Sequence, residues 1–188
     1  MSSSPPHFPA SLRRPVLRFP TQEPCTLEAV DDTVAWTPQD ETTLVTICNQ
    51  PLIYQRLFRK RLGDQPYSVD QAQSFRRWAQ QGWRDRSWFV FLLRDSHDQI
   101  VGAIDIKSDT TEGAEIGYWA SATSPGIITN AVLQLCEVAR EAGYERLFAL
   151  VAPDNVQSLG VVSRAGFVQT EDVTRDGTLY RQFARSLL

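Results

Sequence analysis

The spacing of apolar residues changes near residue 88, and this change limits what the chain can fold into. Before it, apolar residues recur at helical spacing; beyond it, they form short runs with the period of strands. This order indicates an α/β chain. The expected elements are a short strand at 33–36, helices over 37–47, 52–61 and 68–81, and strands at 88–94, 100–107 and 114–120.

The rest of the chain alternates helices and strands. Gly143 is placed to end a helix, and Asp176-Gly177 predicts the turn of a hairpin. The elements expected here are a helix over 127–141, a strand at 146–152, a short helix over 155–165, and hairpin strands at 168–174 and 178–185.

Length and composition indicate one domain. The 188 residues fit a single domain and can bury a core without disulfides. We expect residues 25–188 to form one α/β (α+β) domain with a mixed sheet. Residues 1–24 hold six of the eleven prolines, which predicts a tail or an extended arm lying on the domain. No apolar run approaches the roughly 20 residues of a membrane span.

Cysteine and histidine usage argues against several kinds of site. The three cysteines, Cys25, Cys48 and Cys136, are odd in number and widely spaced, and the two histidines are His7 and His97. This pattern disfavours a zinc site, a disulfide framework and a Ser-His-Asp triad. We therefore expect no metal, no nucleophilic cysteine and a cytoplasmic protein.

The net charge of −3 hides an uneven distribution. Residues 54–94 hold nine basic and three acidic side chains, whereas residues 101–188 hold seven basic and eleven acidic ones. The basic stretch fits solvated helix faces or a binding surface. A nucleic-acid partner is not expected, because such a domain would be strongly basic overall.

The segment 114–131 has the form of a strand, a loop of small residues and a helix. Such a loop leaves backbone N–H groups free at the helix start, and these bind anions such as a pyrophosphate. Gly126 would let the backbone approach a phosphate, and Thr129 could add a hydroxyl. The pattern also fits a plain connection that binds nothing. It is neither a P-loop nor a dinucleotide-binding fingerprint.

Three further polar positions are candidates for chemistry. Asn155 begins the short helix and Ser158 lies one turn later on the same side. They either contact a ligand or serve as a helix cap and an exposed residue. Glu115 opens the strand before the small-residue loop, where its carboxylate could accept a proton from an amine or simply be solvated.

Taken together, these segments resemble the GNAT superfamily of acetyl-CoA-dependent N-acetyltransferases, and within it the ribosomal-protein N-terminal (Rim-type) acetyltransferases. The element order agrees over residues 33–185. The resemblance implies a central, mostly antiparallel sheet with flanking helices and a V-shaped splay between the strands at 114–120 and 146–152. It is carried by Glu115-Ile116-Gly117-Tyr118-Trp119, Gly126-Ile127-Ile128-Thr129-Asn130-Ala131, Asn155-x-x-Ser158 and Arg164-Ala165-Gly166-Phe167.

The resemblance also implies a site in which an amine attacks acetyl-CoA directly. Backbone groups at and around Trp119 would pair with the pantetheine arm, and the loop at 123–128 would bind the pyrophosphate. Glu115 would be the general base, and Ser158 would protonate or solvate the thiolate. The implied cofactor-binding residues are Tyr118, Trp119, Thr123, Ser124, Gly126, Ile127, Ile128, Thr129, Asn155, Ser158 and Arg164.

The loop departs from the family pattern, which begins with Gln or Arg and ends with a small residue. Here Thr123 replaces the Gln or Arg, Pro125 supplies no N–H, and Ile128 replaces the small residue. Each lost charge-assisted donor costs about 1.5–3 kcal/mol of binding free energy. Weaker acetyl-CoA binding, a different acyl group and a lost activity are all compatible with this loop.

The expected function is transfer of acetyl from acetyl-CoA to a primary amine, on a small molecule or on a protein or peptide N-terminus. In this family the basic stretch forms the wall of the acceptor site, which suits an acidic acceptor or a ribosome-associated protein. We expect a monomer or homodimer without a membrane partner. The alternative is a catalytically silent GNAT-like module that binds a ligand or partner.

Overall fold

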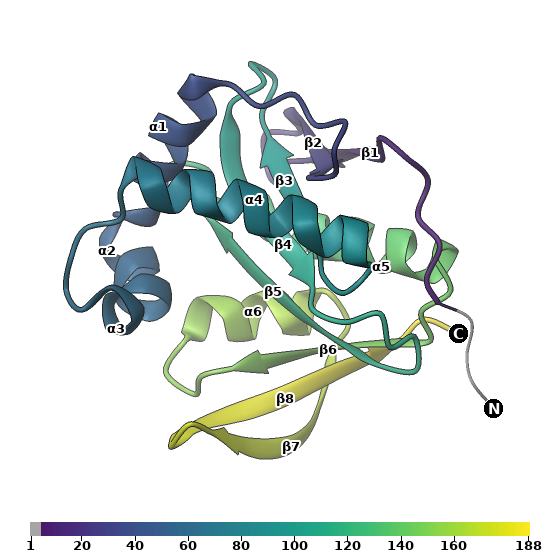
Figure 1. Ribbon diagram of the computed structural model, residues 1–188. Helices are drawn as coiled ribbons and strands as arrows, with labels where there is room; N and C mark the ends of the chain where they lie inside the picture. Colours follow the sequence, from purple (N-terminus) through teal and green to yellow (C-terminus); the bar gives the residue numbers. More distant parts are fainter. Residues whose placement is uncertain (1–4) are drawn as a thin grey trace.

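The computed structural model describes residues 5–188 as an eight-stranded sheet flanked by helices (Figure 1). The strand order is β1-β2-β3-β4-β5-β6-β8-β7, and neighbouring strands are antiparallel except β5 and β6, which are parallel. The expected mixed, mostly antiparallel sheet is confirmed. The strands are β1 (Arg13–Leu17), β2 (Pro24–Ala29), β3 (Phe89–Arg94), β4 (Ile100–Ile106), β5 (Ala114–Ala120), β6 (Arg146–Val151), β7 (Val168–Arg175) and β8 (Thr178–Ser186).

The helices divide the core into two parts. In Figure 1, α4 crosses in front of the central strands, and with α1 it buries Leu92 and Ala103. The other part of the core contains Ile116, Leu135 and Val162, from β5, α5 and α6. The helices are α1 (Pro38–Cys48), α2 (Pro51–Ile53), α3 (Arg59–Leu62), α4 (Val69–Asp85), α5 (Ile128–Glu141) and α6 (Val156–Arg164), with a π-helical turn at Tyr54–Phe58.

Local sequence signals set the element ends as expected. Thr37 and Asp40 form a reciprocal capping box at the start of α1, where Pro38 occupies the first turn. Ser68 and Gln71 cap α4 in the same way. The turn at Asp176-Gly177 has positive φ at both residues, as a tight hairpin requires.

The amino-terminal region differs from the expectation. Residues 33–36 form no strand, whereas β1 and β2 were not predicted. Strand β1 is the edge of the sheet, where Pro15 is tolerated because an edge strand has spare N–H groups. Leu12 and Val16 belong to the core, so part of the expected tail or arm is built into the domain. The serine run at 2–4 lies outside the described residues.

The sheet opens between β5 and β6. Their pairing covers only Ala114–Leu147 and Glu115–Phe148. On the other side of β5, Lys107 donates to the carbonyl of Glu115, so odd-numbered residues of β5 direct their backbone groups toward β4. The N–H groups of Tyr118 and Ala120 therefore face the opening, which is the splay that the family resemblance implied.

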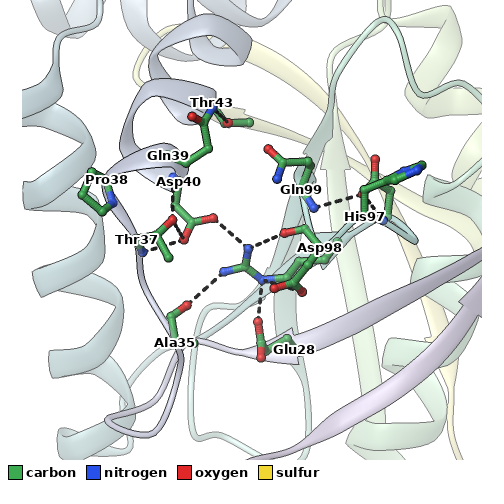
Figure 2. Close-up of polar contacts among 12 residues, drawn as sticks. Glu28, Ala35, Thr37, Pro38, Gln39, Asp40, Thr43, His97, Asp98 and Gln99 are labelled. Carbon is green, nitrogen blue, oxygen red and sulfur yellow. Dashed lines mark hydrogen bonds and ion pairs between the residues drawn. The ribbon is translucent and has the colours of Figure 1, made fainter.

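A buried arginine fixes the position of α1 on the sheet. Arg94, at the end of β3, donates to Glu28 Oε2 at 2.6 Å and to Asp40 Oδ1 at 2.7 Å. It also donates to the carbonyls of Asp98 and Ala35. Figure 2 shows these groups converging on one guanidinium from β2, the start of α1 and the β3–β4 turn. The cluster thus ties together segments that are distant in sequence.

Candidate active site

A cavity of about 970 Å³ lies at the opening between β5 and β6. It is lined by the end of β5 with the following loop, the first turn of α5, the start of α6, and the helical stretch at 50–57. The structure brings together at this cavity the expected residues Tyr118, Trp119, Ser124, Gly126, Ile128, Thr129, Asn155, Ser158 and Arg164.

The loop before α5 uses some of its N–H groups internally and leaves others free. The N–H of Ser124 donates to the carbonyl of Ser121, and that of Thr123 to the Ser121 hydroxyl. Thr123 and Ser124 therefore do not present free N–H groups to a phosphate. The N–H groups of residues 127–130, in the first turn of α5, have no partner within the described residues 5–188. Among the expected loop and helix positions, an anion would therefore bind at the first turn of α5 rather than at Thr123 and Ser124.

A glycine is required at position 126 for the packing of the chain itself, apart from any approach of a phosphate. Its φ is +84°, and a Cβ there would lie 1.8 Å from the carbonyl oxygen of Phe19. The N–H of Phe19 donates to the carbonyl of Gly126, and Asn130 Nδ2 donates to the carbonyl of Leu17. The glycine is therefore needed because the amino-terminal segment packs directly on this loop.

Arg164 supplies a cation at the start of α5. Its Nε lies 3.3 Å from the hydroxyl of Thr129, and both residues line the cavity. The positive end of the helix dipole and a guanidinium thus converge on one spot. An exposed arginine with five N–H donors suits a phosphate group.

The start of α6 carries the expected polar pair. Asn155 Oδ1 accepts the N–H of Ser158 at 3.2 Å, which makes Asn155 the cap of α6 and leaves its Nδ2 without a partner in the described part of the chain. The Tyr118 hydroxyl donates to the carbonyl of Ser158 at 3.3 Å. Burial raises the pKa of Tyr118 to about 12, so this phenol stays protonated at neutral pH.

The helical stretch at 50–57 closes the cavity from the other side and is tied to both loops. The Gln50 side chain donates to Ser121 Oγ and accepts the N–H of Ala122. Arg56, in the π-helical turn, forms a bidentate pair with Asp154, each contact 3.2 Å long. Leu52 and Leu57 line the cavity although they are about half exposed. This wall is therefore mainly apolar, with one ion pair.

The side chains of three expected site residues do not line the cavity. Ile127 buries its side chain in the core and offers only its backbone N–H at the start of α5, and Thr123 is outside the cavity lining. Glu115 is also outside the lining, and its two oxygens pair with Lys107 Nζ at 2.8 Å and with Arg175 at 2.9 Å. Both carboxylate oxygens of Glu115 are thus already engaged by cations, so the geometry does not favour the role given to Glu115.

Reasoning from sequence missed Gln50 and Arg56. Gln50 belongs to no motif, and Arg56 lies in the basic stretch at 54–94, whose charge fits solvated helix faces as well as a binding surface. Their contacts join residues that are 71 and 98 positions apart in the chain, which local patterns do not reveal.

No metal site is found among residues 5–188, since no three His, Cys, Asp or Glu side chains lie together as ligands would. The three cysteines are free and buried. Burial raises the pKa of Cys48 to about 12 and that of Cys136 to about 11, so neither is a nucleophile at neutral pH. No helix of the described residues has the length and apolar character to cross a bilayer.

Comparison with known proteins gives one family match and many similar structures. The family model of the acetyltransferase (GNAT) domain matches residues 34–168. No curated protein sequence matches the chain significantly.

The similar structures have low sequence identity. Mycobacterium smegmatis RimJ, solved with a CoA-disulfide, is 20% identical with a TM-score of 0.73, over 93% of this chain and 86% of that one. The microcin C7 self-immunity acetyltransferase MccE, solved with acetyl-CoA and AMP, is 19% identical with a TM-score of 0.69, over 86% and 92%. A Salmonella typhimurium acetyltransferase that modifies the N-terminal serine of a ribosomal subunit protein is 18% identical with a TM-score of 0.66, over 86% and 94%. These likenesses concern the fold.

Proposed function

This chain belongs to the acetyltransferase (GNAT) domain family, and from that membership together with its cavity we propose that it acetylates a primary amine with acetyl-CoA. The observation that carries the proposal is the coincidence of three features at one cavity. These are the unpaired edge of β5, the free first turn of α5, and Arg164. An alkyl amide chain followed by a pyrophosphate would be complementary to these three features in that order.

The donor would bind from β5 toward α5. The N–H groups of Tyr118 and Ala120 would hydrogen-bond the pantetheine as an added strand does. The N–H groups of residues 127–130 and the Arg164 guanidinium would hold the pyrophosphate. Arg164 would then supply the side-chain N–H donor that the family's Gln or Arg supplies at position 123. Asn155 Nδ2 is free to donate to a pantetheine carbonyl.

The transfer needs no covalent enzyme intermediate. A neutral amine attacks the thioester carbonyl, and a backbone N–H at the end of β5 would stabilise the oxyanion. Ser158 and Tyr118 both line the cavity, and the protonated phenol of Tyr118 reaches from β5 to the carbonyl of Ser158, so either hydroxyl could donate a proton to the leaving thiolate. The acceptor amine would reach the carbonyl past Trp119 and the wall at 50–57.

We propose a cytoplasmic enzyme with a protein or peptide N-terminus as its acceptor. The solved structures that resemble it include ribosomal-protein acetyltransferases, which supports an amino-terminal amine over a small molecule. The free cysteines support a reducing compartment. The basic stretch favours an acidic acceptor less than its charge count suggests, because Arg94 is buried and Arg56, Arg59 and Arg84 are already paired.

The test is incubation with acetyl-CoA and a panel of amines and of peptides with different free N-terminal residues. Free thiol release and peptide mass report turnover. We expect acetylation of at least one amino-terminal peptide, and no product with an amino-terminally blocked copy of it. Arg164→Gln should raise the KM for acetyl-CoA about 10-fold or more with little change in kcat.

The silent-module alternative keeps one supporting observation, the loss of loop donors at Thr123 and Pro125. Thermal unfolding with and without CoA, read together with the turnover assay, distinguishes an active acetyltransferase from a silent ligand-binding module. A ligand at about 100 times its Kd stabilises by about 2.7 kcal/mol. Stabilisation by CoA without any turnover across the panel would favour the silent module. No stabilisation at millimolar CoA and no turnover would contradict both.

A further inference from the structure

A cluster of charged side chains lies on β4 and β5 next to the cavity, on the face that α1 and α4 cover. Asp105 is paired with Gly117, and neither residue lines the cavity itself, but Trp119, two residues farther along β5, does. Alternation of side chains puts Asp105, Gly117 and Trp119 on the same face of the sheet. Trp119 and Trp88 pack with the α1 and α4 core, which identifies that face.

The absence of a side chain at Gly117 brings Asp105 close to β5. A Cβ at Gly117 would lie 3.0 Å from Asp105 Oδ1 and 2.9 Å from Lys107 Cε. Asp105 Oδ1 accepts the N–H of Gly117 at 3.0 Å. Asp105 therefore lies over the strand whose far end would hold the thioester.

The two carboxylates of this cluster have different surroundings. Glu115 is held by Lys107 from β4 and by Arg175 from β7. Asp105 forms no ion pair within residues 5–188, and it accepts a hydrogen bond from the neutral backbone N–H of Gly117. Trp88 Nε1 is buried and unpartnered among the described residues, and it lies close enough to Asp105 to favour the charged form.

Burial raises the pKa of Asp105 to about 6, against the lowering effects of Lys107, the Gly117 N–H and Trp88, and with a smaller raising effect from Glu115. A proton acceptor works best when its pKa is near the working pH. Asp105 meets this condition, whereas Glu115 is committed to two cations. The raised pKa of Asp105 agrees with its contacts among the described residues, which already show that Asp105, unlike Glu115, is not held by a cation.

We propose that Asp105 accepts the proton of the acceptor amine during acetyl transfer, an assignment that rests on the proposed function. Two residues along a strand span about 7 Å, so one water can connect Asp105 with an amine beside Trp119. The ammonium gives one proton to the Asp105 carboxylate, and the nitrogen lone pair forms the C–N bond. The C–S bond breaks, the hydroxyl of Ser158 or Tyr118 gives its proton to the thiolate sulfur and takes up the second nitrogen proton, and Asp105 returns its proton to water.

The kinetic test compares Asp105→Asn, Asp105→Glu and Glu115→Gln, with the best peptide of the panel and saturating acetyl-CoA. Asp109→Asn, an exposed carboxylate in the β4–β5 connection, is the matched control. We expect kcat of wild type to rise through about pH 6. Asp105→Asn should lose that rise and about 100-fold in kcat. Asp105→Glu should restore part of the rate, and Glu115→Gln should keep the rise.

A second measurement needs no acceptor. The Gly117 amide donates to Asp105, so its backbone NMR resonance should titrate with a midpoint near pH 6 in wild type and in Glu115→Gln. Asp105→Asn should abolish this titration. A flat Gly117 resonance, or an Asp105→Asn protein that keeps both kcat and its pH dependence, would overturn the role of Asp105 alone. A wild-type protein without any turnover would overturn the proposed function, and this role with it.

Discussion

At the scale of single residues, the site consists of side chains that serve both the fold and the proposed chemistry. Asn155 caps α6 with its side-chain oxygen Oδ1 and keeps its side-chain nitrogen Nδ2 available. Tyr118 supports the same turn through the carbonyl of Ser158. Changes at these positions therefore need two readouts, one of stability and one of turnover.

We predict different outcomes for two neighbouring alanine variants. Ser158→Ala removes only a hydroxyl, because the capping bond uses the Ser158 N–H, so kcat should fall while the free energy of unfolding stays near wild type. Asn155→Ala removes the cap and should cost about 1 kcal/mol of stability as well as donor affinity. Urea unfolding and acetyl-CoA titration of the rate measure both effects. Full activity of both variants would mean that the start of α6 is not part of the site.

Asp105 also predicts a pH-dependent stability effect. Its pKa is raised in the folded protein, so the folded state binds the proton more tightly than the unfolded one, and stability falls as pH rises from about 4 to about 6. A shift of about two pKa units is worth up to about 3 kcal/mol. Asp105→Asn should therefore be more stable than wild type at about pH 7, and this advantage should shrink near pH 4. Urea midpoints at the two pH values test it; an equal difference at both would contradict it.

At the scale of elements, the local signals in the sequence were sufficient for the ends of most helices and strands. Thr37, Ser68 and Asp176-Gly177 act through neighbours within four residues, so their roles can be read from the chain. Strand β1 could not be read in this way. Its Pro15 and its alternating exposed residues fit a strand only because β2 pairs with it and the edge position tolerates proline.

The same limit applies to the candidate site. Tyr118, Gly126 and Asn155 lie at the cavity because a strand, a loop and a helix of recognisable type carry them. The pairing of Glu115 with Arg175 depends on where the β7–β8 hairpin lies, and no local pattern specifies that. Sequence reasoning could therefore propose residues around the cavity, but it could not foresee the ion pairs that engage Glu115.

We predict that loss of Arg94 strongly destabilises the protein, because Arg94 fixes the start of α1 on the sheet. Arg94→Met would leave Glu28 and Asp40 buried without their shared cation, which should cost about 3–5 kcal/mol in the free energy of unfolding. Arg84→Met, which removes an arginine from the exposed pair with Asp32, is the control and should change little. Equal losses in both variants would contradict a special role for Arg94.

At the scale of the whole molecule, the amino-terminal segment and the proposed donor site form one structural unit. Deleting residues 1–24 removes β1 together with Phe19 and exposes the edge of β2. We predict a soluble but less stable protein, or aggregation through β2, and a raised KM for acetyl-CoA. Circular dichroism and acetyl-CoA titration measure the two effects. Deleting residues 1–4 is the control, and a 1–24 deletion with wild-type KM would contradict the prediction.

The contact between Phe19 and Gly126 also has a consequence for the order in which the protein folds. Leu17 and Asn130 are 113 positions apart, and contacts that join distant parts of a chain form slowly because a long loop must close first. The loop that would receive the phosphates therefore reaches its final form only after the two ends of this span have met. Affinity for acetyl-CoA should then increase late in folding, after the segment at 17–19 has packed on this loop.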